Sequence, residues 1–124
     1  MILKTNLEDM NSLIIEGKAM EAFDKYYDDN VIMQENENPP IIGKEENRKR
    51  ELDFFDSLEK FHKAEIKSSA IGDETTMVEW VFDITPKGMP QTEMKQVAVQ
   101  KWKNNKIINE KFYYDASSKI KEGT

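Results

Sequence analysis

The stretch that decides the fold runs from Thr75 to Asp115 and reads TTMVEWVFDITPKGMPQTEMKQVAVQKWKNNKIINEKFYYD. Apolar and polar side chains alternate in three segments of it, residues 75–84, about 93–102 and 107–114. Alternation with a period of two is typical of β-strands, whose successive side chains point to opposite faces. The stretch therefore predicts three long antiparallel strands that follow one another along the chain.

Turn-forming residues separate these strands in the sequence. Pro86, Gly88 and Pro90 break the first pair of strands. Asn104 and Asn105 predict a two-residue hairpin between the second and third strands, because asparagine tolerates the positive φ angles of such turns. The alternation and the turns together predict a compact meander.

Counting from a two-residue hairpin fixes a predicted register. Val99 then lies opposite Glu110, and Trp80 lies near Val97. One face becomes almost wholly apolar apart from Glu110, and it holds Val78, Trp80, Phe82, Val97, Val99, Ile108, Phe112 and Tyr114. The other face mixes polar side chains with Met77, Val81, Ala98, Trp102 and Tyr113.

The remaining segments complete an α+β domain. Helical spacing of apolar residues predicts helices over 5–16, 18–27 and 44–58, with Leu52, Phe55 and Leu58 as the inward stripe of the last one. Strands are expected over 31–35 and 61–71, and a loop over 36–43. The expected order is α-α-β-α-β-β-β-β, with the helices packed on one face of an antiparallel sheet.

Composition bounds the possible functions. The chain has 124 residues, which suits one domain over 1–124, with a core of about 5–115 and a loose tail over 116–124. It has no cysteine and a single histidine, so we expect no disulfide and no thiolate or histidine-rich metal site. No other metal-site or phosphate-loop motif stands out, and we expect no metal and no cofactor. The net charge of −6 opposes binding to nucleic acid and to anionic membranes. With no apolar run of about 20 residues and no signal peptide, we expect a cytoplasmic protein.

Several motifs, in order, resemble the nuclear transport factor 2-like (NTF2-like) superfamily in its SnoaL-like, or polyketide cyclase-like, branch. They are FDKYYDDNV at 23–31, Gly43, Gly72-Asp73 and NKIINEKFYYD at 105–115. The resemblance implies a cone-shaped curved sheet wrapped around the N-terminal helices, an apolar pocket, and homodimers through the outer sheet face. The superfamily holds isomerases, cyclases, dehydratases, hydrolases and binding modules, so the fold alone does not give the function.

The resemblance also allows a test against ketosteroid isomerases. The position of their aspartate base holds Gln34, that of their first-helix tyrosine holds Met10, and that of their buried acid holds Val97 or Ala98. Tyr26 is the one supporting hydroxyl that matches. We therefore do not expect steroid isomerisation.

Glu110 and His62 are the candidate proton carriers. Glu110 is the acid on the predicted apolar face, where a carboxylate must pair, shift its pKa or meet a polar ligand. The alternatives for Glu110 are a salt bridge with Lys95 or Arg48, or a register that exposes it to solvent. His62 lies where dehydratase members of the superfamily carry a histidine that could act as a general base, but a lone histidine at a strand start is more often a surface residue. Asp115 is either a pocket acid, as in SnoaL-type cyclases, or an ordinary turn residue.

The sequence therefore predicts a pocket protein of undetermined chemistry. The expected pocket residues are Met10, Phe23, Tyr26, Gln34, Phe55, Trp80, Val97, Val99 and Phe112. We expect this pocket to bind a small apolar molecule. The alternatives are an acid–base enzyme on such a molecule and a non-catalytic dimeric binding module. The expected dimer uses the outer face defined by Met77, Val81, Ala98, Trp102 and Tyr113.

Overall fold

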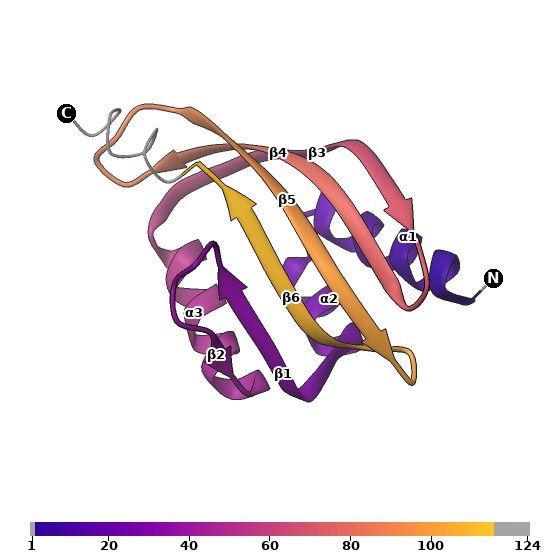
Figure 1. Cartoon of the computed structure of the whole chain (residues 1–124). Coiled ribbons are helices and arrows are strands. Elements are labelled where there is room, and N and C mark those ends of the chain that lie inside the picture. Colours follow the sequence, from indigo (N-terminus) through magenta and orange to yellow (C-terminus); the bar gives the residue numbers. More distant parts are fainter. Residues whose placement is uncertain (1, 116–124) are drawn as a thin grey trace.

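A computed structural model describes residues 2–115 of the chain (Figure 1). Its helices are α1 (Ile2–Ile15), α2 (Ala19–Tyr26) and α3 (Lys44–Asp56). Its strands are β1 (Tyr27–Glu35), β2 (Ile41–Ile42), β3 (Leu58–Ile71), β4 (Thr75–Pro86), β5 (Thr92–Lys103) and β6 (Lys106–Tyr114). The predicted α+β order is confirmed, with the short strand β2 added inside the expected loop. The predicted loose tail lies outside the described residues.

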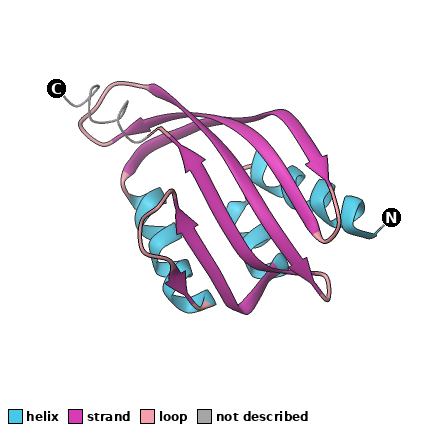
Figure 2. Ribbon diagram, viewed as in Figure 1, coloured by secondary structure: helices cyan, strands magenta, loops and turns pink. Residues whose placement is uncertain are grey.

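The strands form one curved, six-stranded sheet in the order β2-β1-β6-β5-β4-β3. Strand β1 runs parallel to β6, and every other neighbouring pair is antiparallel. The helices lie together behind the sheet in the view of Figure 2, so one sheet face is covered and the other is open. An antiparallel sheet of this kind packs one face on the core and leaves the other to solvent.

The register predicted for β5 is wrong, because the β5–β6 pair contains a bulge. Lys103 pairs with Lys106, as the two-residue turn requires, but the pairing shifts by one residue between Lys101 and Trp102. Beyond this point Gln100 lies opposite Glu110, where the two-residue count places Val99. An extra residue on one strand shifts the pairing by one, so each residue of the partner strand points to the sheet face opposite to the one predicted. Gln96, Ala98, Gln100 and Trp102 therefore point inward, and Val97 and Val99 point outward.

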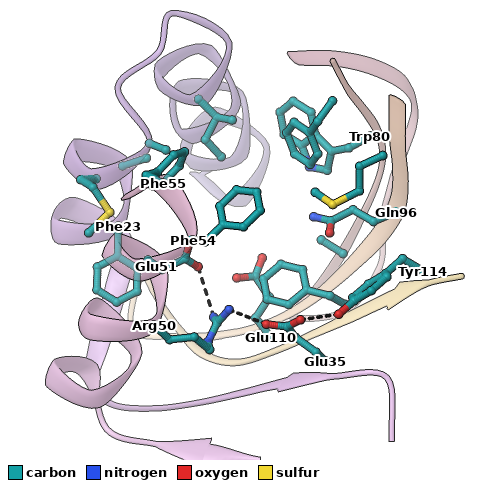
Figure 3. A pocket seen from close by; sticks show the side chains of 18 of the residues that line it. Phe23, Glu35, Arg50, Glu51, Phe54, Phe55, Trp80, Gln96, Glu110 and Tyr114 are labelled. Atoms are coloured by element: carbon teal, nitrogen blue, oxygen red, sulfur yellow. Dashed lines mark hydrogen bonds and ion pairs between the residues drawn. The ribbon is translucent and has the colours of Figure 1, made fainter. Parts of the chain in front are cut away.

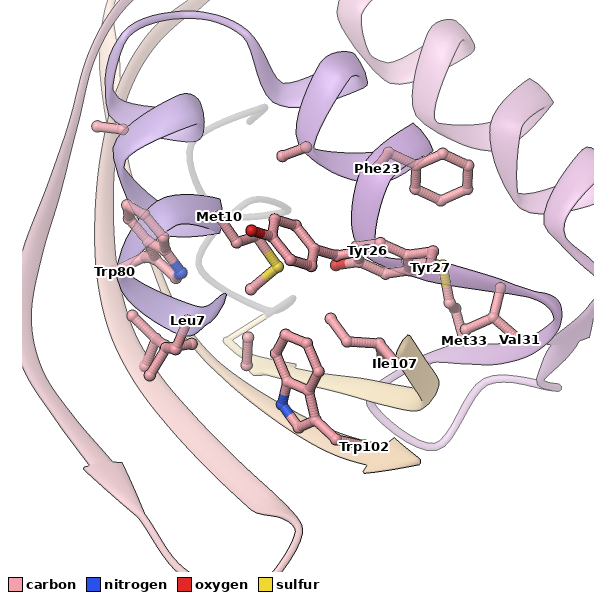
Figure 4. Close-up of a cluster of buried hydrophobic side chains, with 14 of the residues drawn as sticks. Leu7, Met10, Phe23, Tyr26, Tyr27, Val31, Met33, Trp80, Trp102 and Ile107 are labelled. Carbon is pink, nitrogen blue, oxygen red and sulfur yellow. The ribbon is translucent and has the colours of Figure 1, made fainter. Parts of the chain in front are cut away.

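The exchange moves Ala98 and Trp102 from the predicted dimer face into the core. Their exposed fractions are 1% and 4%. The Trp102 ring meets Tyr26 edge to face, with 6.0 Å between ring centroids, and lies beside Ile107 in the buried cluster of Figure 4. The expectation that these two residues lie on the outer face is therefore wrong. On that face Met77 and Tyr113 are exposed, as expected.

Of the inward stripe predicted for helix α3, Phe55 and Leu58 face the interior as expected and Leu52 does not. Leu52 is 44% exposed, whereas Asn47 is fully buried and Glu51 and Phe54 face inward. The Asn47 amide donates to the carbonyl oxygens of Ile41 at 3.0 Å and Gly43 at 2.8 Å, which ties the helix to strand β2. In the part of the chain that the structure describes, no helix is long and apolar enough to span a membrane.

Candidate ligand-binding cavity

A cavity of about 150 Å³ lies between the helices and the concave side of the sheet (Figure 3). Helices α2 and α3 form one wall, and strands β4, β5 and β6 form the opposite wall. Its lining is mostly aromatic and aliphatic, and it comprises Ile14, Ala19, Met20, Ala22, Phe23, Tyr27, Glu35, Arg50, Glu51, Phe54, Phe55, Phe61, Trp80, Phe82, Met94, Gln96, Ala98, Gln100, Glu110, Phe112 and Tyr114. An apolar cavity with a few polar groups is the usual form of a small-molecule site.

Aromatic rings form a continuous wall on one side of the cavity. Trp80 stacks on Phe82 with ring centroids 5.2 Å apart and planes inclined by 15°. The Phe82 ring contacts Phe61 at 5.8 Å, and Phe61 contacts Phe55 at 6.0 Å. Phe54 extends the chain from Phe55 at 5.4 Å. The rings come from α3, β3 and β4, so the wall depends on the whole fold.

Glu110 is buried among hydrogen-bond donors at the floor of this cavity. It is 2% exposed. The Tyr27 hydroxyl donates to one carboxylate oxygen, and the Gln100 amide donates to the other at 2.8 Å. The Gln100 carbonyl oxygen accepts from the Thr76 hydroxyl at 2.6 Å, and that hydroxyl oxygen accepts from the Trp102 indole N–H at 2.9 Å. The polar groups that the bulge turns inward are thus satisfied by one another and by Glu110.

Burial raises the pKa of Glu110 to about 7, because a charged carboxylate is poorly solvated there. The hydrogen bonds from Tyr27 and Gln100 stabilise the ionised form and lower the pKa, while the negative charge of Glu51 raises it. Burial and the neighbouring Glu110 charge also raise the pKa of Tyr27 well above its usual value. Tyr27 therefore stays a hydrogen-bond donor, and Glu110 can exchange a proton near neutral pH.

A second group of charges lies beside Glu110 (Figure 3). The Arg50 guanidinium donates to Glu35 at 2.8 Å and to Glu51 at 3.2 Å. The Tyr114 hydroxyl donates to the other oxygen of Glu35. Burial is the main cause that raises the pKa of Glu51 and brings the pKa of Tyr114 to about 12. Glu35 and Glu51 thus share one guanidinium, and Glu110 lies beside them without a direct contact to it among the described interactions.

Five of the predicted site residues line the cavity, namely Phe23, Phe55, Trp80, Phe112 and Glu110. Met10 and Tyr26 are buried in the core beside it. The remaining predictions lie elsewhere.

Val97 and Val99 lie on the outer sheet face because of the bulge. The Gln34 amide donates to the Asn38 carbonyl at 2.9 Å, away from the cavity. His62 is exposed and lies 2.7 Å from the Thr85 hydroxyl, so the structure does not bring it to Glu110. Asp115 lines a separate, larger hollow of about 850 Å³, whose charged lining residues are exposed.

Sequence reasoning missed Tyr27, Gln100, Arg50, Glu51 and Glu35 as cavity residues. One signal was available for Glu51, which follows Asn47 by four positions and precedes Phe54 by three, the spacing of one helix face. No signal marked Gln100, since its inward position depends on the bulge. Among residues 2–115, no group of three or more His, Asp or Glu side chains is placed to hold a metal ion.

Comparisons with known proteins agree with this architecture. The sequence profile of the SnoaL-like domain matches residues 4–114. Comparison with curated proteins gives no match. A protein from Mesorhizobium loti, provisionally described as a SnoaL-like polyketide cyclase, superposes with a TM-score of 0.83 at 26% identity, over 92% of this chain and 100% of that chain.

Two further solved structures share the fold at lower identity. An NTF2-like protein of unknown function from Burkholderia pseudomallei K96243 superposes with a TM-score of 0.85 at 9% identity, over 98% of this chain and 97% of that chain. A Catenulispora acidiphila protein with a ketosteroid isomerase-like fold, solved in complex with trimethylamine, gives 0.71 at 16% identity, over 82% and 78%. The predicted fold is therefore confirmed.

Proposed function

Because this chain belongs to the SnoaL-like domain family of the NTF2-like superfamily, we propose that its cavity binds a small, mainly apolar organic molecule. The observation that carries this proposal is the buried carboxyl of Glu110 on the floor of an aromatic-walled cavity. The aromatic wall supplies apolar surface, and the carboxyl group supplies one polar contact that orients a ligand.

The size of the cavity limits the ligand. A cavity of about 150 Å³ is large enough for one benzene-sized molecule. A four-ring steroid or polyketide exceeds this space in the present conformation. The chain also has Met10 and Gln34 at positions where ketosteroid isomerases carry catalytic residues, which argues against a steroid as the ligand. We therefore expect a ligand of one ring or of comparable volume.

The buried acid carries a stability cost that a purely structural module would avoid. Because burial raises the pKa of Glu110 to about 7, ionisation of this group at and above neutral pH opposes folding. This cost is understandable if the acid serves a ligand.

Acid–base catalysis is the second candidate function, and the pKa of Glu110 near 7 favours it. A carboxyl group with this pKa both donates and accepts protons at neutral pH. Tyr27 donates to one of its oxygens and Gln100 to the other, which fixes the orientation of the carboxyl group. The reaction class this supports is proton transfer to or from a small apolar substrate.

Binding of benzyl alcohol, followed by tryptophan fluorescence, tests the proposed function. Trp80 lines the cavity, so its emission should change on binding. Ala98→Leu places extra volume inside the cavity and should abolish binding, while Val97→Leu, one residue away on the outer face, should leave it intact. Circular dichroism checks whether both variants fold. If Ala98→Leu does not fold, Ala19→Leu on α2 is a second cavity-filling variant. Equal binding by a folded cavity-filling variant and by Val97→Leu would contradict the proposal.

A further inference from the structure

The charges around the cavity do not balance. Among the described residues that line it, the acids are Glu35, Glu51 and Glu110, and Arg50 is the only basic side chain. Glu35 is fully engaged, with one oxygen bound by Arg50 and the other by Tyr114. The positive charge of Arg50 therefore neutralises Glu35, and its contact to Glu51 is longer, at 3.2 Å. When Glu51 and Glu110 are ionised, a positive charge is missing on the side of the cavity where they lie.

Arg50 is not available to an anionic ligand. One terminal nitrogen donates to Glu35, and the other contacts Glu51 and lies 3.8 Å from the Met33 sulfur. The guanidinium carbon also lies 5.8 Å from the centre of the Phe112 ring. An anion would have to displace these partners while approaching two further carboxyl groups. Like charges in a low-dielectric site repel strongly, so anions are excluded.

The aromatic wall suits the hydrocarbon part of an ammonium ion. Aromatic side chains that line a pocket supply the apolar surface that such a group needs. Trp80, Phe55 and Phe112 all line the same cavity as the acids. A charged amine on a small hydrocarbon body would meet carboxylates at one end and rings around the other.

From this geometry we infer that the ligand of the cavity is a small organic ammonium ion, of about the volume of a single ring, whose charged nitrogen lies between Glu51 and Glu110. This inference rests on the proposed function and specifies the ligand class for the same cavity. The two carboxyl groups would hold the nitrogen through charge-assisted hydrogen bonds, which are stronger than neutral ones.

Three probes of matched shape test the inference, namely benzylamine, benzyl alcohol and benzoate. Their affinities are measured for the unmutated protein by tryptophan fluorescence at about pH 8, where Glu110, with its pKa of about 7, is mostly ionised. We expect benzylamine to bind at least about tenfold more tightly than benzyl alcohol, which corresponds to about 1.4 kcal/mol. Benzoate should bind most weakly.

The three probes separate the two claims. Benzyl alcohol binding as tightly as benzylamine, or benzoate binding best, would overturn the ammonium inference and leave the proposed function standing. Failure of all three probes to bind would overturn both.

Glu51→Gln tests the assigned carboxyl group. This variant should lose most of the preference for benzylamine over benzyl alcohol. Glu59→Gln, an exposed glutamate on β3, changes the net charge equally and should preserve the preference. If Glu51→Gln and Glu110→Gln both retain the full preference, the nitrogen does not lie between these two residues and the inference is wrong.

Discussion

Two hydrogen-bond donors fix the position of Glu110, and burial makes it a weaker acid than an exposed glutamate. Tyr27 and Gln100 hold its oxygens, yet their hydrogen bonds only partly offset the loss of solvation, so its pKa rises to about 7. The folded state therefore binds this proton more tightly than the unfolded state, in which the pKa is about 4.5. The consequence is a pH-dependent contribution to stability with a definite sign.

That contribution is fully present below pH 4.5 and is lost as the pH rises through about 7. The difference between these two pKa values corresponds to about 3 kcal/mol. We predict that the free energy of unfolding of the unmutated protein, relative to Glu110→Gln, falls by about this amount between pH 4.5 and 8. Urea unfolding at a series of pH values measures it, with Glu59→Gln as the control. A difference that grows with pH would contradict the assignment.

Tyr27→Phe removes one donor to the Glu110 carboxylate. A hydrogen bond to a charged group contributes about 1.5–3 kcal/mol, so its loss should raise the pKa of Glu110 by about one to two pH units. Titration of the side-chain carboxyl carbon by NMR, in protein labelled at glutamate, reports this pKa. An unchanged or lower value would mean that Tyr27 does not support the ionised form.

At the scale of elements, the bulge between β5 and β6 separates what the sequence could predict from what it could not. Alternation and turn residues predicted the strands and the Asn104-Asn105 turn, and Glu110, Phe112 and Tyr114 face inward as predicted. The register that places apolar residues of all three strands on one face then predicted Val97 and Val99 as inward residues. The structure instead turns Gln100 and Trp102 inward, because Glu110 and Thr76 satisfy their polar groups. These hydrogen bonds join residues of different strands, so the alternation of polar and apolar residues within β5 does not reveal them.

A pair of truncations distinguishes the two registers. Trp102→Ala empties a buried position and should cost about 3–5 kcal/mol of stability. Val99→Ala, on the outer face, should cost no more than about 0.5 kcal/mol. Urea unfolding of both variants gives the comparison. The opposite order of costs is what a register without the bulge would produce.

At the scale of the whole molecule, the outer sheet face remains the proposed dimer surface with a corrected membership. Met77 and Tyr113 are exposed there by 45% and 46%. The prediction that Ile108 lies on the inner face is wrong, since this residue is 37% exposed. Val97 and Val99 replace Ala98 and Trp102 on the outer face. Exposed apolar clusters of this kind mark interaction surfaces. The bulge changes which residues form the patch and leaves it apolar.

We predict a homodimer through this face, with a mass twice 14.5 kDa by light scattering at micromolar concentration. Tyr113→Glu places a charge in the patch and should give the monomer mass. Ile42→Glu, at a 66% exposed position on strand β2, is the matched control and should remain dimeric. A monomer mass for the unmutated protein would show that the patch has another use.

Intermolecular NOEs between benzylamine and the protein show whether the aromatic cavity, with Glu110 on its floor, binds a small molecule, because they report which side chains the ligand contacts. We expect NOEs from the benzyl protons to Trp80, Phe55 and Phe112. NOEs confined to Met77 and Tyr113 on the outer face, or none at saturating benzylamine, would contradict binding in this cavity.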